Sequence, residues 1–197
     1  MYLKSKVTIT QILDAAQRSF VSNNYNDITM AAIAQEANIT KGAIYHHFES
    51  KEDLFLQMMV RYLNGIQVLL GQAVDETLGG PREQLSRLTT AFLEQPLEDQ
   101  RVIQLVRRDA NRFTDGTRQT LIAAYQEALP NQIEAIIAEG IANGQIKGGD
   151  ARLIAWQHVA IVEVYLSNYA RQKFNTPEAM AKYLTSVFFD GVGMESS

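Results

Sequence analysis

The chain has 197 residues, 46% of them hydrophobic, which is enough for one compact unit or two small ones with a buried core. It contains no cysteine, which excludes disulfides, a thiolate nucleophile and cysteine-ligated metal sites. The formal net charge of −4 argues against a protein that coats nucleic acid through bulk positive charge.

The beginning of the chain lacks the apolar run of a signal peptide, and no uncharged apolar stretch reaches the roughly 18 residues that a membrane span needs. The lack of cysteine also fits a reducing compartment. We therefore expect a cytoplasmic protein that is not exported and has no membrane partner.

The first predicted helix is marked by apolar residues at the spacing of one buried stripe, namely Ile9, Ile12, Leu13, Ala16 and Phe20. The pattern Thr8-x-x-Gln11 is typical of a capping box and predicts the start of this helix. Turn-prone residues 22–27 predict its end. A second helix can then begin near Thr29.

Helical periods continue to residue 191, with breaks at residues 79–81, 95–96, 114–116, 143–144 and 175–177. Ser50, Asp150 and Thr176 are placed to cap the helices that follow them, and Pro130 predicts a kink or break. The fourth helix is expected over residues 51–78, and the last two over residues 151–173 and 177–191. About nine helices and no strand make this an all-α protein.

Residues 29–48 read as two short helices joined by a tight turn. Ala34 and Ala37 are small where two crossing helices come close, and Asn38 tolerates the left-handed backbone that the turn requires. Thr40 can cap the second of these helices. Its first two turns would expose Thr40, Lys41, Gly42, Tyr45 and His46. Such residues can bind phosphates and reach base edges in a major groove. An ordinary helical hairpin without DNA binding fits the same spacing.

The run from Asp27 to Leu54 resembles the DNA-binding signature of the TetR family of bacterial transcriptional regulators (TetR/AcrR type). The resemblance rests on the pattern Lys41-Gly42-x-x-Tyr45-x-His47-Phe48-x-x-Lys51-x-x-Leu54 and covers roughly the first quarter of the chain. Two positions depart from the family pattern. Ala32 stands where an acidic residue is common, and Asn38 stands where glycine is common.

The resemblance implies a three-helix helix-turn-helix DNA-binding domain in residues 1–50. It also implies a helical ligand-binding and dimerisation domain in residues 51–191, followed by a tail at residues 192–197. On this basis Lys51 would hold a DNA phosphate. The other residues implied to contact DNA are Thr29, Thr40, Lys41, Gly42, Tyr45, His46 and His47.

Metal and enzyme sites find little support. Successive helical residues diverge by about 100°, so His46 and His47 do not converge on one ion. His158 and Glu163 are five residues apart and lie on different helix faces. The chain has no nucleophile motif, phosphate-binding glycine loop or dinucleotide fingerprint. We therefore expect no metal, no cofactor and no enzyme activity.

Glu163 interrupts an apolar helix, and a buried carboxylate needs a partner. It either pairs with an arginine, for which Arg107, Arg108 and Arg112 are the candidates, or recognises a cationic or hydrogen-bonding ligand. Aromatic residues could line a ligand pocket or form plain core; these are Tyr62, Phe92, Tyr125, Trp156 and Tyr165.

The last two predicted helices are apolar over more of their circumference than one buried face requires, which indicates a partner surface. In the family, the corresponding helices pair across a two-fold axis. The resemblance therefore implies a homodimeric, ligand-responsive regulator, most often a repressor, that binds a palindromic operator and is released by a small molecule. The alternative is a helical small-molecule-binding or interaction protein without operator binding.

Overall fold

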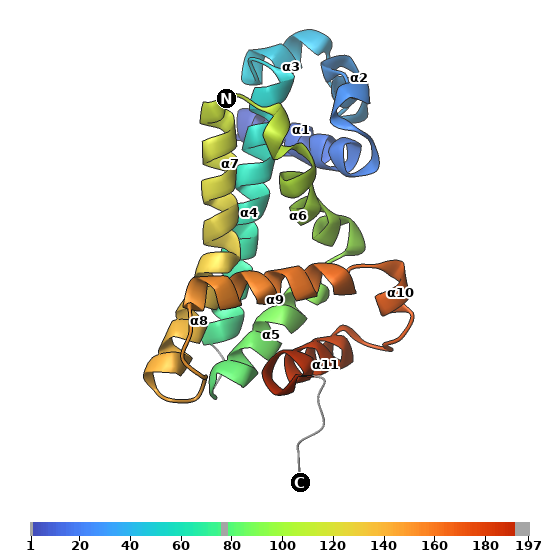
Figure 1. The fold of residues 1–197 in the computed structure, drawn as a ribbon. Helices are drawn as coiled ribbons and strands as arrows, with labels where there is room; N and C mark the ends of the chain where they lie inside the picture. The colour runs from blue at the N-terminus through green and yellow to red at the C-terminus, as the bar shows by residue number, and fades with distance from the viewer. Residues whose placement is uncertain (1, 76–78, 192–197) are drawn as a thin grey trace. The chain divides into compact units, whose positions relative to one another are not determined.

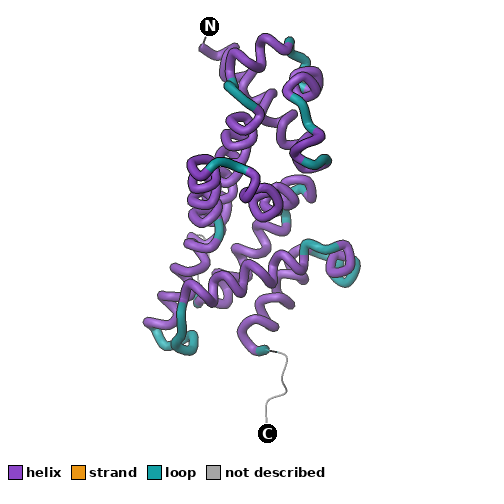
Figure 2. Tube along the Cα trace, turned by 45° about the horizontal axis from the view of Figure 1, so that its top comes forward, coloured by secondary structure: helices purple, strands orange, loops and turns teal. Residues whose placement is uncertain are grey.

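The computed structural model describes residues 2–75 and 79–191, with side chains from residue 8 onwards. These residues form eleven α-helices and two short 3-10 helices, and no strand occurs among them (Figure 2). The predicted all-α class is confirmed, with two more helices than expected. The predicted tail at residues 192–197 and Leu78 at the end of the fourth predicted helix lie outside the described residues.

The helices follow the chain in the order labelled in Figure 1. Their bounds are α1 Tyr2–Ser22, η1 Tyr25–Asp27, α2 Met30–Glu36, α3 Lys41–His47, α4 Lys51–Asp75, α5 Pro81–Leu93, α6 Leu97–Asp109, η2 Ala110–Arg112, α7 Asp115–Ala128, α8 Pro130–Ala142, α9 Ala151–Tyr165, α10 Asn168–Arg171 and α11 Pro177–Asp190. None of the described helices combines the length and apolarity that a membrane span requires.

Most predicted helix ends are confirmed by side-chain caps. The side chains of Ser50, Asp150 and Thr176 each accept a backbone N–H from the third residue after them, at 3.0–3.1 Å. Pro130 occupies the first position of α8, and only Leu129 separates it from the end of α7. A proline there loses no helical hydrogen bond, because the first amides of a helix have no intrahelical acceptor.

Two predicted boundaries are wrong. The first helix begins at Tyr2 instead of at the Thr8 capping box, so Thr8 lies inside α1. The helix predicted over residues 151–173 is interrupted, because α9 ends at Tyr165 and α10 starts at Asn168. The hydroxyl of Ser167 accepts the Ala170 N–H at 3.3 Å and so begins a new helix.

The chain divides into two compact units. The first unit comprises residues up to 64 and residues 97–125. Its core includes an aromatic cluster in which Phe20, Tyr25 and Phe113 each pack against Phe55, with ring centroids 4.9–5.6 Å apart. This cluster ties α1 and the loop after it to α4 and to the segment following η2. The predicted functional boundary at residue 50 stays a prediction.

The second unit comprises residues 65–96 and the described residues from 126 to 191. Within it α5 packs against α8 and α11, and α9 packs against α8 and α11 (Figure 1). The interior of these helices is apolar and includes the fully buried residues Leu85, Ile137, Ala155 and Leu184. A buried histidine, His158, is set into this apolar interior.

Candidate DNA-binding interface and effector-domain residues

The two short helices α2 and α3 form the predicted helix-turn-helix. Thr40 caps α3 as expected, and Thr29 caps α2 in the same way. The Thr29 hydroxyl accepts the Ala32 N–H at 3.1 Å, and the Thr40 hydroxyl accepts the Ala43 N–H at 3.2 Å. Asn38 has a φ of 55°, the left-handed conformation that turns the chain between the helices. The turn geometry therefore follows from three side chains that the sequence marks out.

The inner side of this motif is fully apolar. Ile33 of α2, Ile44 of α3 and Phe48 at the end of α3 are each at most 1% exposed. Ala34 and Ala37 are also buried, which allows the backbones of the two helices to come close. Glu36 at the end of α2 accepts hydrogen bonds from Arg18 and Ser19 of α1, both at 2.7 Å. The buried side of α3 therefore holds it against α2, and α2 is in turn bonded to α1.

The outer side of α3 carries the polar residues of the motif. Thr40, Lys41, Gly42 and His46 are exposed, and Tyr45 is 49% exposed. Thr29, at the start of α2, is also exposed. His47 is half-buried, with its ring centroid 5.2 Å from that of His46. A hydroxyl, an ammonium, an aromatic ring and an imidazole are therefore available to an external partner along one short helix.

Neither the backbone conformation nor the packing around Gly42 requires a glycine at this position of α3. Its φ is not in the left-handed region, and an added Cβ would meet only the Thr40 hydroxyl oxygen, at 3.9 Å. The protein itself has room for a side chain there. A glycine at such a position lets an external surface approach the backbone closely.

Lys51 has an internal role that the sequence did not suggest. Its ammonium donates to the backbone oxygens of Tyr25 and Ile28, at 2.7 and 2.8 Å, and lies 4.3 Å from the centre of the Tyr25 ring. Burial lowers the pKa of Lys51, and nearby Asp27 partly opposes that shift. The ammonium braces the loop between α1 and α2. Its predicted contact with a DNA phosphate stays a prediction.

The sequence analysis also missed a buried carboxylate at the end of α6. Asp109, at the end of α6, is 1% exposed and pairs with Arg108 at 2.7 Å and Arg112 at 2.9 Å. Arg108 additionally donates to the backbone oxygens of Phe20 and Asn23 at the end of α1. The signal available in the sequence was the arginine-rich segment 107–112, but nothing local showed that it receives the end of α1.

The six residues proposed as ligand contacts are divided between the two units. Tyr62 and Tyr125 belong to the first unit, where the Tyr62 hydroxyl donates to the Asp99 backbone oxygen at 2.5 Å and burial raises the pKa of Tyr62. Tyr125 is buried, and its pKa is raised by the same cause.

The other four predicted ligand contacts belong to the second unit. Phe92 is buried, Trp156 is 36% exposed, and Glu163 is half-buried. Burial raises the pKa of Tyr165, whose ring lies 6.4 Å from that of Tyr183. Two cavities of this unit are lined by other residues. The ligand contacts and the alternative ion pair of Glu163 stay predictions.

His158 is the most buried polar group of the second unit, at 0% exposure. Its Nε2 lies 3.1 Å from the Thr89 hydroxyl on α5, and its ring meets the Phe188 ring of α11 edge-on at 5.0 Å. Burial lowers the pKa of His158 to about 4, because a charged imidazolium would lose its hydration. The imidazole is therefore neutral at neutral pH.

Large apolar side chains remain exposed on α9, α10 and α11. Among the described residues they include Leu153, Val164, Tyr169 and Tyr183, which are 53–72% exposed. Exposed apolar residues gathered on consecutive helices are typical of a protein–protein interface. They lie on the helices for which the sequence predicts a partner surface, and that role stays a prediction.

The comparisons with known proteins agree with these features. Residues 12–58 match the family model "Bacterial regulatory proteins, tetR family", and residues 78–192 match "Tetracyclin repressor-like, C-terminal domain". The HTH-type regulator YhgD of Bacillus subtilis is 29% identical over 82% of this chain and 83% of its own length. The fatty acid metabolism regulator protein of Bacillus subtilis is 25% identical over 73% of each chain.

Two solved structures share the fold. FadR from Bacillus subtilis in complex with stearoyl-CoA aligns with a TM-score of 0.79 at 20% identity, over 93% of this chain and 99% of its own. AibR in complex with isovaleryl coenzyme A and operator DNA aligns with a TM-score of 0.77 at 21% identity, over 92% of this chain and 98% of its own.

Proposed function

Because the chain belongs to the TetR family of bacterial transcriptional regulators, it is a ligand-responsive DNA-binding regulator, and we propose that the exposed face of α3 binds a palindromic operator. The observation that carries the proposal is the capped, internally fixed α3 with its exposed polar residues. Repression, relieved when a small molecule binds, is the mode of regulation proposed. Operator binding places the protein in the cytoplasm, with the DNA.

The polar residues of α3 have different roles in this proposal. The Lys41 ammonium binds a phosphate. The hydroxyls of Thr29 and Thr40, which already accept a backbone N–H, donate to phosphate oxygens of the DNA backbone. Gly42 allows the backbone of α3 to approach the DNA. Tyr45 and His46, one turn further along, reach base edges in the major groove, with His47 at the margin of the contact.

A second copy of the chain covers the exposed apolar residues of α9, α10 and α11. A symmetric dimer of this kind binds two half-sites on the same face of the DNA, about 34–36 Å apart, which is one helical turn. An inverted repeat is the operator symmetry that such a dimer requires.

An acyl-CoA thioester is the effector class that we propose. One relative regulates fatty acid metabolism, and two structures with the same fold hold stearoyl-CoA and isovaleryl coenzyme A. The effector acts by stabilising a conformation that binds the operator less well, and a typical coupling of about 1–3 kcal/mol changes operator affinity about 5–150-fold. No chemistry on the effector is needed, so the protein is proposed not to be an enzyme.

Selection of duplexes from a random DNA pool by the purified protein tests operator binding. Sedimentation of the selected complex gives its stoichiometry. An enriched inverted repeat bound by an even number of chains is expected. A folded dimer that enriches no sequence at low salt would favour the interaction protein without operator binding.

Titration of the protein–operator complex with acyl-CoA thioesters of different chain length tests the effector class. Free coenzyme A and the matching free fatty acids serve as controls. We expect thioesters to release the operator and the controls to have little effect. Release by none of the thioesters, with operator binding intact, would overturn the effector class and leave the DNA-binding function standing.

A further inference from the structure

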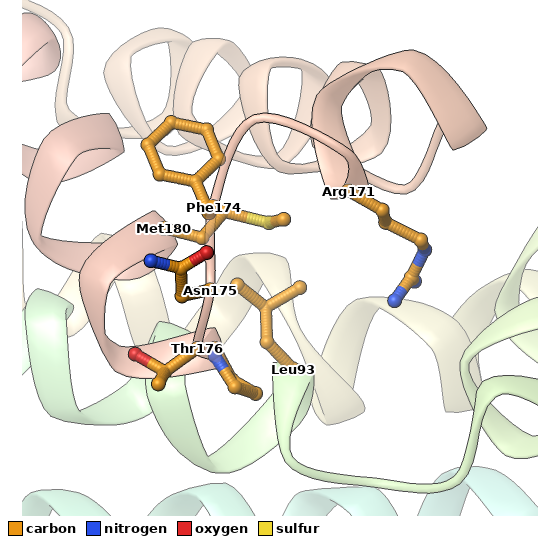
Figure 3. Close-up of a pocket in the computed structure, with 7 residues that line it drawn as sticks. Leu93, Arg171, Phe174, Asn175, Thr176 and Met180 are labelled. Carbon is orange, nitrogen blue, oxygen red and sulfur yellow. The ribbon is translucent and has the colours of Figure 1, made fainter.

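The exposed side of α6 and η2 is formed by arginine and amide side chains. From residue 101 to residue 112 the exposed residues are Arg101, Gln104, Arg107, Arg108, Asn111 and Arg112. The single acidic residue of this stretch, Asp109, is 1% exposed. By contrast, the hollow of the second unit drawn in Figure 3 has one charged residue, Arg171, in its lining. We term Arg101, Gln104, Arg108 and Arg112 the arginine face, a local concentration of positive charge in a chain whose net charge is −4.

Two guanidinium groups of the arginine face are held by one buried carboxylate. The Nε atoms of Arg108 and Arg112 form ion pairs with Asp109 at 2.7 and 2.9 Å, and the two arginine side chains are still 36% and 45% exposed. Arg108 also donates through Nη2 to two backbone oxygens at the end of α1. Within the part of the chain that the structure describes, Nη1 of Arg108 and both Nη atoms of Arg112 have no partner. Two oriented guanidinium groups therefore have donors available to a ligand.

Arg101 supplies a second cationic position on the same side of α6. It lies seven residues before Arg108, and residues with this spacing share a helix face. The helical rise places the two residues about 10 Å apart along α6. Arg101 is exposed and forms no hydrogen bond or ion pair with the other described residues. The exposed Gln104 lies between Arg101 and Arg108 in the helix.

The charge and spacing of the arginine face match a ligand with separate phosphate groups. Arg108, Arg112 and Asp109 together have one net positive charge, and Arg101 adds a second. A planar guanidinium binds phosphate oxygens through two parallel hydrogen bonds. Coenzyme A carries a diphosphate at the 5′ position and a single phosphate at the 3′ position of one nucleotide. Such a ligand can occupy both cationic positions at once.

We propose that the arginine face binds the nucleotide part of coenzyme A, an inference that rests on the acyl-CoA effector class proposed above. The adjacent guanidinium groups of Arg108 and Arg112 bind the diphosphate. Arg101 binds the 3′-phosphate, and the Gln104 amide donates between the two positions. Free coenzyme A binds this face in both conformations of the protein, and a ligand that binds two conformations equally shifts neither. It therefore remains a control for operator release.

Calorimetric titration of the full chain with coenzyme A, 3′-dephospho-coenzyme A and pantetheine tests the proposal. The second ligand lacks only the 3′-phosphate, and the third lacks every phosphate. The chain has no cysteine, so these thiols form no mixed disulfide with it. We expect coenzyme A to bind about five- to tenfold more tightly than dephospho-coenzyme A, because one charged contact is lost, and pantetheine to bind at least about tenfold more weakly than either. Equal binding of the three ligands, or no binding of coenzyme A, would overturn the proposal.

Arg101→Gln tests the position of the 3′-phosphate. Because Arg101 has no partner among the described residues, the substitution removes no internal bond. In this variant coenzyme A and dephospho-coenzyme A are expected to bind equally. The matched control is Arg118→Gln, at an arginine of α7 that is 40% exposed and pairs with Asp115, and it leaves the preference for coenzyme A unchanged. A preference that persists in Arg101→Gln would overturn the assignment of this residue.

Gln104→Glu tests the site without changing any arginine. The new carboxylate lies between the two cationic positions and repels both phosphate groups, so binding of coenzyme A and of dephospho-coenzyme A is expected to weaken about tenfold. Binding of pantetheine, which carries no charge of this kind, stays the same. Unchanged binding of coenzyme A by Gln104→Glu would contradict a site on this face.

Failure of this site is distinguishable from failure of the proposed function. Operator release by thioesters, with coenzyme A and dephospho-coenzyme A bound equally, would overturn the arginine face and leave the effector class standing. Coenzyme A binding that depends on Arg101, without release by any thioester, would support the site and overturn the effector class. Weaker operator binding by Arg101→Gln, with coenzyme A binding unchanged, would overturn the proposal and assign the arginine face to the DNA backbone.

Discussion

The two units of the chain differ in how their functional groups are specified. In the first unit, the residues proposed to bind DNA lie within one continuous segment, and their positions follow from local caps at Thr29 and Thr40 and from the turn at Asn38. In the second unit, polar groups come together from distant parts of the chain, as His158 and Thr89 do across 69 residues. A surface built locally can be read from sequence, whereas a buried site built from several helices cannot.

The largest expected effect on stability comes from the buried histidine of the second unit. His46 is exposed on α3, whereas His158 is buried with a pKa lowered to about 4. Between about pH 6.5 and pH 4 the unfolded chain binds the His158 proton more tightly, so stability is full above pH 6.5 and falls with acidification, by on the order of 3 kcal/mol. Urea unfolding of the wild type at several pH values measures this loss.

The variant His158→Gln separates this effect from general acid sensitivity. Glutamine can still bond to Thr89 but does not titrate, so its free energy of unfolding is expected to fall less steeply over the same pH range. Parallel pH profiles for the two proteins would show that His158 does not control acid stability.

Two lysines of one sequence motif have different roles within the first unit. Lys51 donates to two backbone oxygens, whereas Lys41 is exposed on α3. Lys51→Gln is expected to lower the free energy of unfolding by about 1–2 kcal/mol, because two partly buried carbonyls lose a charged donor. Lys41→Gln leaves it unchanged. Thermal unfolding of both variants measures the two free energies of unfolding. An equal decrease in the two variants would contradict the assigned roles.

Lys41→Gln is expected to act on DNA binding instead. Loss of one phosphate contact weakens operator binding by about 1 kcal/mol and reduces the slope of log affinity against log salt by about 1. Operator titrations at several salt concentrations measure both quantities. An unchanged slope would remove Lys41 from the DNA interface.

Gly42→Ala is expected to have a small effect on stability, opposite in sign to that of Lys51→Gln. Alanine favours a helix over glycine, and the added Cβ meets only the Thr40 hydroxyl at 3.9 Å, so the free energy of unfolding is expected to rise by about 0.5 kcal/mol. Operator binding weakens, because the methyl group keeps the backbone from the DNA. A variant that is more stable and binds DNA as well as the wild type would contradict the close approach.

The limits of sequence reasoning can be seen at particular residues. The caps and the Asn38 turn were predictable because each involves residues at most four positions apart. The internal role of Lys51 was not, since its acceptors are backbone oxygens 23 and 26 residues away. Ser167 begins α10 inside a stretch whose apolar periodicity continues, so the break in the predicted helix left no periodic signal.

The separation in sequence between contacting residues also explains why the functional residues of one unit were easier to predict than those of the other. The exposed residues of α3 were predictable from a contiguous pattern together with a family resemblance. The burial of Asp109 and the hydrogen bonds from Arg108 to the end of α1 depend on how helices far apart in sequence come to lie together. Tertiary packing, which local propensity does not encode, decides such sites.

Binding of the operator by the exposed face of α3 is tested by removing the two side chains proposed to reach base edges. Equilibrium binding of the selected operator is compared for the wild type and for Tyr45→Ala/His46→Ala, whose exposed side chains contribute little to the fold. Loss of two contacts at base edges, each worth about 1–3 kcal/mol, predicts an affinity at least about tenfold lower with the dimer intact. Equal affinity of the two proteins for the operator would contradict the account.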